Sequence, residues 1–180
     1  MSVVLCAINK GTATIMSDGK ITNTYCAYNQ ENKCKFQHLT NNVIIGYTGE
    51  LNPCEEAISW FKNHLLNNPF ADVYNFQKYL IDLNDKHERT FLMIGKYNNK
   101  IHLLTFGSES KYQFVVNQIL GKEDFYYTAI GTSSINSINL DTYMLMSLPL
   151  ETKMKMCIES IANYDQSVNK TIFTDTISLL

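Results

Sequence analysis

The order of apolar segments along the 180-residue chain constrains its fold most strongly. Short runs rich in β-branched residues and bounded by Asn- or Gly-containing turns predict strands, whereas apolar residues that recur every three to four positions predict helices. The predicted strands span 3–8, 12–17, 35–39, 43–47, 90–96, 101–106, 112–116, 125–130 and 171–174, and the predicted helices span 52–65, 71–86, 132–147 and 150–164. The order is therefore strands, two helices, strands, two helices and a last strand.

Polar residues between these segments set the predicted boundaries. Asn52-Pro53 predicts the start of the first helix, with Asn as N-cap and Pro at the first helical position. The hydroxyls that begin at Thr132 predict a cap for the third helix, and the polar stretch 29–32 predicts a loop.

This order predicts an α+β fold with one arrangement of its layers. Two mostly antiparallel sheets, packed on each other and covered on both outer faces by helices, would bury every apolar face. A chain of this length is sufficient for one well-cored domain and short for two. We therefore expect residues 1–180 to form a single domain, a four-layer α-β-β-α sandwich.

Composition excludes several classes of function. The net charge of -2 provides no field that would attract nucleic acid or an anionic membrane, and no apolar run approaches the length of a membrane span. Four scattered histidines predict neither a metal site nor a Ser-His-Asp arrangement, so we expect no cofactor. The five cysteines are odd in number and scattered along the chain, which favours a protein of the reducing cytoplasm. The Asn- and Lys-rich, Arg-poor composition suggests a bacterial or phage source. The cysteines are Cys6, Cys26, Cys34, Cys54 and Cys157.

The start of the chain carries a candidate nucleophile. Ser2 is small enough for Met1 to be removed, which would leave one residue with both a hydroxyl and a free α-amine. The unperturbed pKa of an α-amine is about 8, so the amine can accept the hydroxyl proton without a histidine. Ser is also a common second residue, and the alternative is that it has no special role.

Three further residues would complete such a site. A cation at Lys35 would depress the amine pKa and stabilise the alkoxide, and the Asp18 carboxylate would hold that lysine. The backbone N–H of Gly49, on a turn before a helix, would donate to the oxyanion. Each residue has an alternative interpretation: Asp18 precedes a glycine and suits a tight turn, Lys33 lies close enough to serve as the cation instead, and Gly49 suits a simple loop-to-helix turn.

Several motifs follow one another in an order that resembles a known family. They are Ser2–Ile8, Gly11, Ile15–Thr22, Lys35–Leu39, Val43–Gly49 and Ala129–Thr132. Together they resemble proteasome β-subunits and their bacterial HslV-type relatives, which are N-terminal-nucleophile (Ntn) hydrolases with this four-layer fold. The resemblance spans nearly the whole chain.

The resemblance implies roles at six positions. It gives Ser2, Asp18, Lys35 and Gly49 the roles argued above, with Ser2 in place of the usual threonine. Thr132 stands at the position of a supporting serine, although such hydroxyls are more often helix caps. Asp165, in the sequence Asp165-Gln166-Ser167, resembles a shortened form of the Asp-x-x-Ser pair that supports the nucleophile.

Two functions are compatible with this sequence. The first is a proteasome- or HslV-like peptidase or amidase that forms an acyl-enzyme on Ser2 after Met1 is removed. The resemblance then implies a homo-oligomer, as a ring or another assembly, with an ATP-dependent unfoldase as a candidate partner. The alternative is a catalytically inactive proteasome-like fold that binds a small molecule or a partner or acts as an assembly scaffold.

Overall fold

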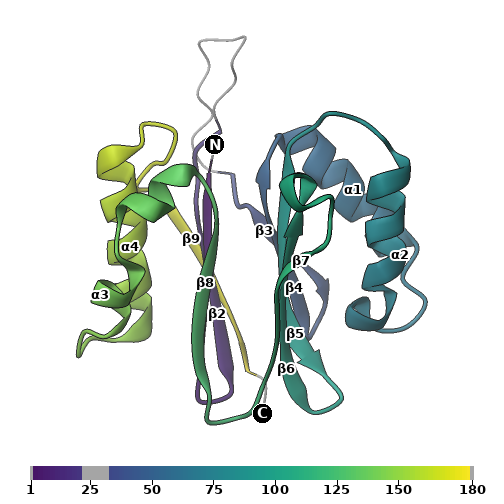
Figure 1. Cartoon of the computed structure of the whole chain (residues 1–180). Coiled ribbons are helices and arrows are strands. Elements are labelled where there is room, and N and C mark those ends of the chain that lie inside the picture. Colours follow the sequence, from purple (N-terminus) through teal and green to yellow (C-terminus); the bar gives the residue numbers. More distant parts are fainter. Residues whose placement is uncertain (1, 22–32, 179–180) are drawn as a thin grey trace.

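The computed structural model describes residues 2–21 and 33–178, so the loop predicted at 29–32 lies outside the described residues. Two antiparallel sheets face each other, and a pair of helices covers the outer face of each (Figure 1). The predicted four-layer α-β-β-α arrangement is confirmed.

The first sheet contains the start of the chain. Its four strands lie in the order β8-β1-β2-β9, and every neighbouring pair is antiparallel. Lys10 and Gly11 connect β1 to β2 with φ angles of 48° and 71°, as tight hairpin turns require. The strands are β1 (Val3–Asn9), β2 (Thr12–Asp18), β8 (Phe125–Gly131) and β9 (Ile172–Ser178). The predicted hairpin is confirmed, and β9 extends further than the predicted 171–174.

The second sheet has five strands in the order β3-β4-β5-β6-β7, again all antiparallel. Its strands are β3 (Phe36–Thr40), β4 (Val43–Gly49), β5 (Arg89–Tyr97), β6 (Lys100–Gly107) and β7 (Phe114–Leu120). The strand predicted over 112–116 begins later, at Phe114, and ends later, at Leu120. Lys111 and Tyr112 have φ angles of 52° and 60°, which are not compatible with an extended strand.

Helices α1 (Leu51–Asn63) and α2 (Pro69–Asp82) cover the five-stranded sheet. The predicted N-cap at Asn52 is wrong, because Gly49 ends β4 with a φ angle of 113° and the helix begins two residues later, with Pro53 inside its first turn. α2 begins before the predicted residue 71, because the Asn68 side chain accepts a hydrogen bond from Phe70 N at 2.9 Å.

Helices α3 (Leu140–Met144) and α4 (Leu150–Tyr164) cover the four-stranded sheet. The single helix predicted over 132–147 is wrong. Thr132 caps only a 3-10 turn, Ser133–Ser137, and Asn139 then caps the separate helix α3. Ser and Asn side chains in this stretch compete for backbone hydrogen bonds and interrupt a continuous helix. Among the described residues, no helix is both long and apolar enough to cross a bilayer.

Three apolar layers hold these elements together. The layer between the two sheets includes Ile15, Leu92 and Leu103, all of which are fully or almost fully buried. Under α1 and α2, Phe61 and Phe76 stack with ring centroids 4.4 Å apart. Under α3 and α4 the core contains Leu5, Met154 and Ile158 among others. These layers fix the strand ends that carry the candidate site.

Candidate active site

Ser2 lies directly before β1, where neighbouring strands hold the backbone from both sides. Its carbonyl oxygen accepts a hydrogen bond from Thr132 N at 2.9 Å, and the next amide, Val3 N, donates to Asp18 Oδ1 at 2.9 Å. Ser2 is only 6% exposed. Because β1 is a central strand, the start of the described chain is fixed against the ends of β2 and β8.

A buried ion pair lies beside this strand end. Lys35 Nζ is 2.8 Å from Asp18 Oδ1, and their side chains are 4% and 0% exposed. Asp18 Oδ2 accepts a further hydrogen bond from Lys20 N at 3.0 Å. Burial lowers the pKa of Lys35, and the neighbouring Asp18 carboxylate opposes that shift. Asp18 therefore connects the cation directly to the backbone that follows Ser2.

Lys33 has a different environment from Lys35. Its Nζ is 2.7 Å from Glu55 Oε1, in a pair whose side chains are 43% and 35% exposed. Tyr47 also donates to Glu55 Oε1, at 2.9 Å. Of the two lysines that the sequence left open, Lys35 is the one that contacts Asp18.

Gly49 ends β4 at a position that only glycine can occupy without strain. Its φ angle is 113°, and a Cβ atom there would lie 2.1 Å from the carbonyl oxygen of Glu88. No hydrogen bond joins Gly49 to Ser2 within the described residues. Its role as an oxyanion donor stays a prediction.

Thr132 and Asp165 are brought together by the fold. Thr132 Oγ1 donates a hydrogen bond to Asp165 Oδ2, and Ser167 donates to Asp165 Oδ1 from its hydroxyl at 2.6 Å and its backbone N at 2.8 Å. Burial opposes ionisation of Asp165, but the hydrogen bonds from Ser167 and Thr132 outweigh it and lower the pKa of the carboxyl to about 2. Because Thr132 N also contacts Ser2, this network supports the same strand end.

The Asp165 carboxylate is expected to stabilise the fold in a pH-dependent way. Its pKa of about 2 is below the value of about 3.9 in an unfolded chain, so its contribution is complete above about pH 5 and is lost as the pH falls toward 2. We expect Asp165→Asn to lower the free energy of unfolding by about 1–2 kcal/mol at pH 7. In urea titrations the difference from the unmodified protein should narrow between pH 5 and pH 2.5. A difference that stays constant over this range would contradict the assignment.

Two polar contacts near the site have no signal in the sequence. Ser17 Oγ accepts a hydrogen bond from Lys35 N at 3.2 Å, and Asn169 Oδ1 accepts one from Gly19 N at 3.0 Å. Asn169 Nδ2 is buried and has no partner among the described residues. The partners in these contacts are 18 and 150 residues apart, so local patterns could not have found them. Within the described residues, no cluster of three or more His, Cys, Asp or Glu side chains is arranged to hold a metal.

Two face-to-face antiparallel sheets, each covered on its outer face by helices, form a four-layer α-β-β-α sandwich. Among solved structures, the chain is similar to eukaryotic HslV from Trypanosoma brucei, with a TM-score of 0.70. The similarity covers 98% of this chain and 99% of that one at 12% sequence identity. No family model and no curated protein matches the sequence. The predicted fold is confirmed.

Proposed function

We propose that this chain is an N-terminal-nucleophile hydrolase of peptide or amide bonds, with Ser2 as nucleophile once Met1 has been removed. The observation that carries the proposal is the buried ion pair between Lys35 and Asp18, which also binds the amide that follows Ser2. A buried charge pair costs desolvation free energy and is weak evidence of a purely stabilising role. The pair lies against Val3, the residue after Ser2, and acyl transfer at Ser2 would require a cation in this position.

In this mechanism, Ser2 Oγ attacks the carbonyl carbon of the scissile bond, and its proton passes to the free α-amine through a bridging water. The carbonyl oxygen becomes an oxyanion, to which the N–H of Gly49 donates. As the tetrahedral intermediate collapses, the C–N bond breaks and the leaving amine takes the proton from the α-ammonium group. Water then hydrolyses the Ser2 ester by the same steps and releases the acid.

The other residues act on the nucleophile rather than on the substrate. The Lys35 ammonium lowers the α-amine pKa by charge repulsion and stabilises the developing alkoxide, while Asp18 holds the lysine in place. Thr132, itself bound to Asp165, positions the Ser2 carbonyl through its backbone N–H. Asp165 and Thr132 are therefore positioning residues.

The state of the N-terminus tests this proposal. Intact-mass measurement of protein purified from its own host should show a chain without Met1. An electrophile that reacts with both a hydroxyl and an adjacent free amine should then label about one site per chain, and Ser2→Ala should remove that labelling. Retention of Met1, or equal labelling of Ser2→Ala, would contradict the hydrolase and favour a binding or scaffold role for the fold.

Self-association is part of the same proposal. Tyr74 on α2 and Ile119 on β7 are 66% and 55% exposed, and large exposed apolar side chains often mark protein interfaces. We expect light scattering to give a mass that is a multiple of 20.6 kDa. A monomer at micromolar concentration would contradict a ring or another assembly. An ATP-dependent unfoldase that feeds it stays a prediction.

A further inference from the structure

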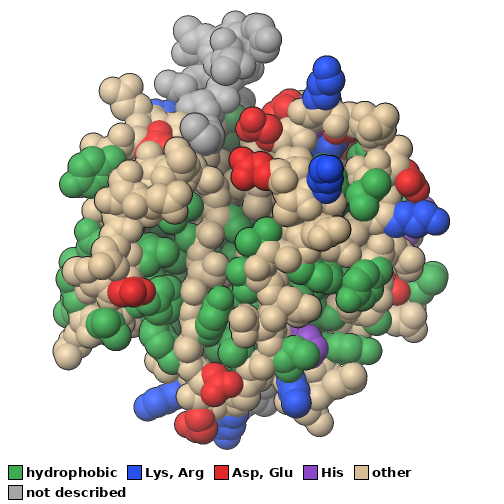
Figure 2. All heavy atoms as spheres, viewed as in Figure 1, with side chains coloured by type: hydrophobic (Ala, Val, Ile, Leu, Met, Phe, Trp, Pro, Cys, Tyr) green, Lys and Arg blue, Asp and Glu red, His purple; other side chains and the backbone are tan. Residues whose placement is uncertain are grey.

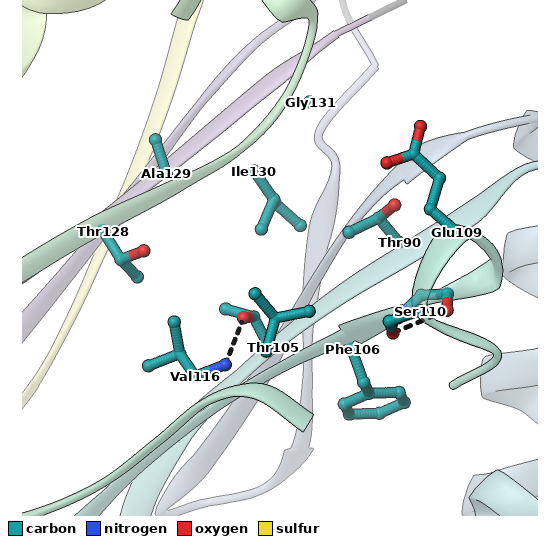
Figure 3. Close-up of a pocket in the computed structure, with 12 residues that line it drawn as sticks. Thr90, Thr105, Phe106, Glu109, Ser110, Val116, Thr128, Ala129, Ile130 and Gly131 are labelled. Carbon is teal, nitrogen blue, oxygen red and sulfur yellow. Dashed lines mark hydrogen bonds between the residues drawn. The ribbon is translucent and has the colours of Figure 1, made fainter. Parts of the chain in front are cut away.

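A cavity of about 450 Å³ lies at one edge of the sandwich, between β8 and the ends of the facing strands β5, β6 and β7 (Figure 3). This volume falls within the range of about 300–1,000 Å³ that is typical of ligand sites. The lining residues are Thr90, Thr105, Phe106, Gly107, Glu109, Ser110, Val115, Val116, Thr128, Ala129, Ile130 and Gly131. Both sheets and the 3-10 turn Ser108–Ser110 therefore contribute to its walls.

Hydroxyl groups make part of this lining available to a polar ligand. Thr105 Oγ1 already accepts a hydrogen bond from Val116 N at 3.1 Å, and Ser110 Oγ donates to Gln113 O at 2.8 Å. The hydroxyls of Thr90 and Thr128 form no hydrogen bond within the described parts of the chain. They retain their acceptor lone pairs for a ligand.

Glu109 gives the cavity its charge. It is the one charged residue in the lining, it is exposed, and it has no ion-pair partner among the residues that the structure describes. Its side chain extends from the 3-10 turn toward β8 (Figure 3). On the face shown in Figure 2, uncharged and apolar side chains cover most of the middle, and charged side chains lie mainly toward the ends.

This combination fits one class of chemical group. A carboxylate and two hydroxyl acceptors match an ammonium or guanidinium group, which carries several N–H donors and no acceptor. The apolar side chains of Ile130 and Val116 match the alkyl part of a long basic side chain. An anionic group would meet the Glu109 charge with no cation in the lining to offset it.

One wall of the cavity adjoins the strand end that follows Ser2. Gly131 forms one end of it, and the next residue, Thr132, donates its backbone N–H to Ser2 O at 2.9 Å. We propose that this cavity is a subsite that receives a lysine or arginine side chain of the peptide substrate. The inference rests on the proposed hydrolase function, because it takes the cavity to be an extension of the Ser2 site.

Binding of defined peptides to the Ser2→Ala protein tests the subsite without turnover. The probes are acetylated alanine hexapeptides in which lysine, or norleucine as its uncharged counterpart, occupies each position in turn. At one position the lysine peptide should bind at least about threefold more tightly than the norleucine peptide. Glu109→Gln in the same background should remove that preference, and so should raising NaCl from 0.05 to 0.5 M. Glu151→Gln removes an exposed carboxylate on α4 and should leave the preference intact.

The outcomes separate the subsite from the hydrolase. Equal binding of lysine and norleucine peptides at every position, no measurable binding, or an unchanged preference in Glu109→Gln would overturn the subsite. Selective, Glu109-dependent binding of a lysine peptide that the mature protein never cleaves would support the subsite and overturn the hydrolase. Cleavage of lysine and norleucine peptides with the same kcat/KM would support the hydrolase and overturn the subsite.

Discussion

Lys35→Met is expected to lower kcat by about 10²–10⁴-fold and the free energy of unfolding by about 3 kcal/mol. The rate falls because no cation remains to depress the α-amine pKa or to stabilise the alkoxide. Stability falls because the Asp18 carboxylate, which is 0% exposed, would stay buried with backbone N–H groups as its only donors among the described residues. Peptide turnover by the mature protein and urea unfolding measure the two effects.

Two companion variants separate the electrostatic role of Lys35 from its structural one. Adding Asp18→Asn to Lys35→Met removes the unpaired charge and should restore most of the stability, while activity stays low. Lys33→Met breaks only the partly exposed pair with Glu55 and should cost less than about 1 kcal/mol. If the double variant regained activity together with stability, Lys35 would have no electrostatic role in the reaction.

Gly131→Ala is expected to destabilise the fold by at least about 3 kcal/mol and to lower the turnover of any folded protein by about 10²-fold. Gly131 has a φ angle of 130°, and an added Cβ would lie 1.9 Å from the carbonyl oxygen of Ser2. The overlap can be relieved only if β8 and the start of β1 move apart, which displaces Ser2, the proposed nucleophile. Chemical denaturation and turnover of the mature variant measure both consequences.

Gly121→Ala is the matched control for this substitution. At that position the nearest atom to an added Cβ is Asp124 Oδ2, at 3.5 Å, which is ordinary contact. The change in stability should stay within about 0.5 kcal/mol. Equal stability of the two alanine variants would show that β8 does not approach Ser2 as closely as described.

The sequence was sufficient to predict most of the architecture, because the signals for strands and for the hairpin are local. The β1–β2 hairpin and helix α4 match their predicted ranges closely, since each is specified by a short apolar pattern with clear ends. The region 132–147 was not predictable in the same way. Its Ser and Asn side chains can cap several short turns, and tertiary packing decides which of these turns form.

The candidate site could be predicted only in part. The contact between Asp18 and Lys35 was expected and is present, but where this pair lies depends on how the end of β2 meets the segment before β3, which no local pattern specifies. The contact of Thr132 with Asp165 is equally non-local, because 33 residues separate them. The cavity beside Glu109 had no signal at all, because its walls come from strands in both sheets.

The pairing of β2 with β9 has a consequence for how the protein is made. Because synthesis runs from N- to C-terminus, β1 and β2 are made before β9, and the open edge of β2 is covered only when residues 172–178 have been synthesised. The backbone N–H of Gly19, next to Asp18, likewise cannot form its hydrogen bonds to Asn169 and Thr171 until those residues have been synthesised. A nascent chain therefore contains Ser2, the proposed nucleophile, long before it can complete the surrounding sheet. Formation of this sheet is thus delayed until segments from both ends of the described chain are available.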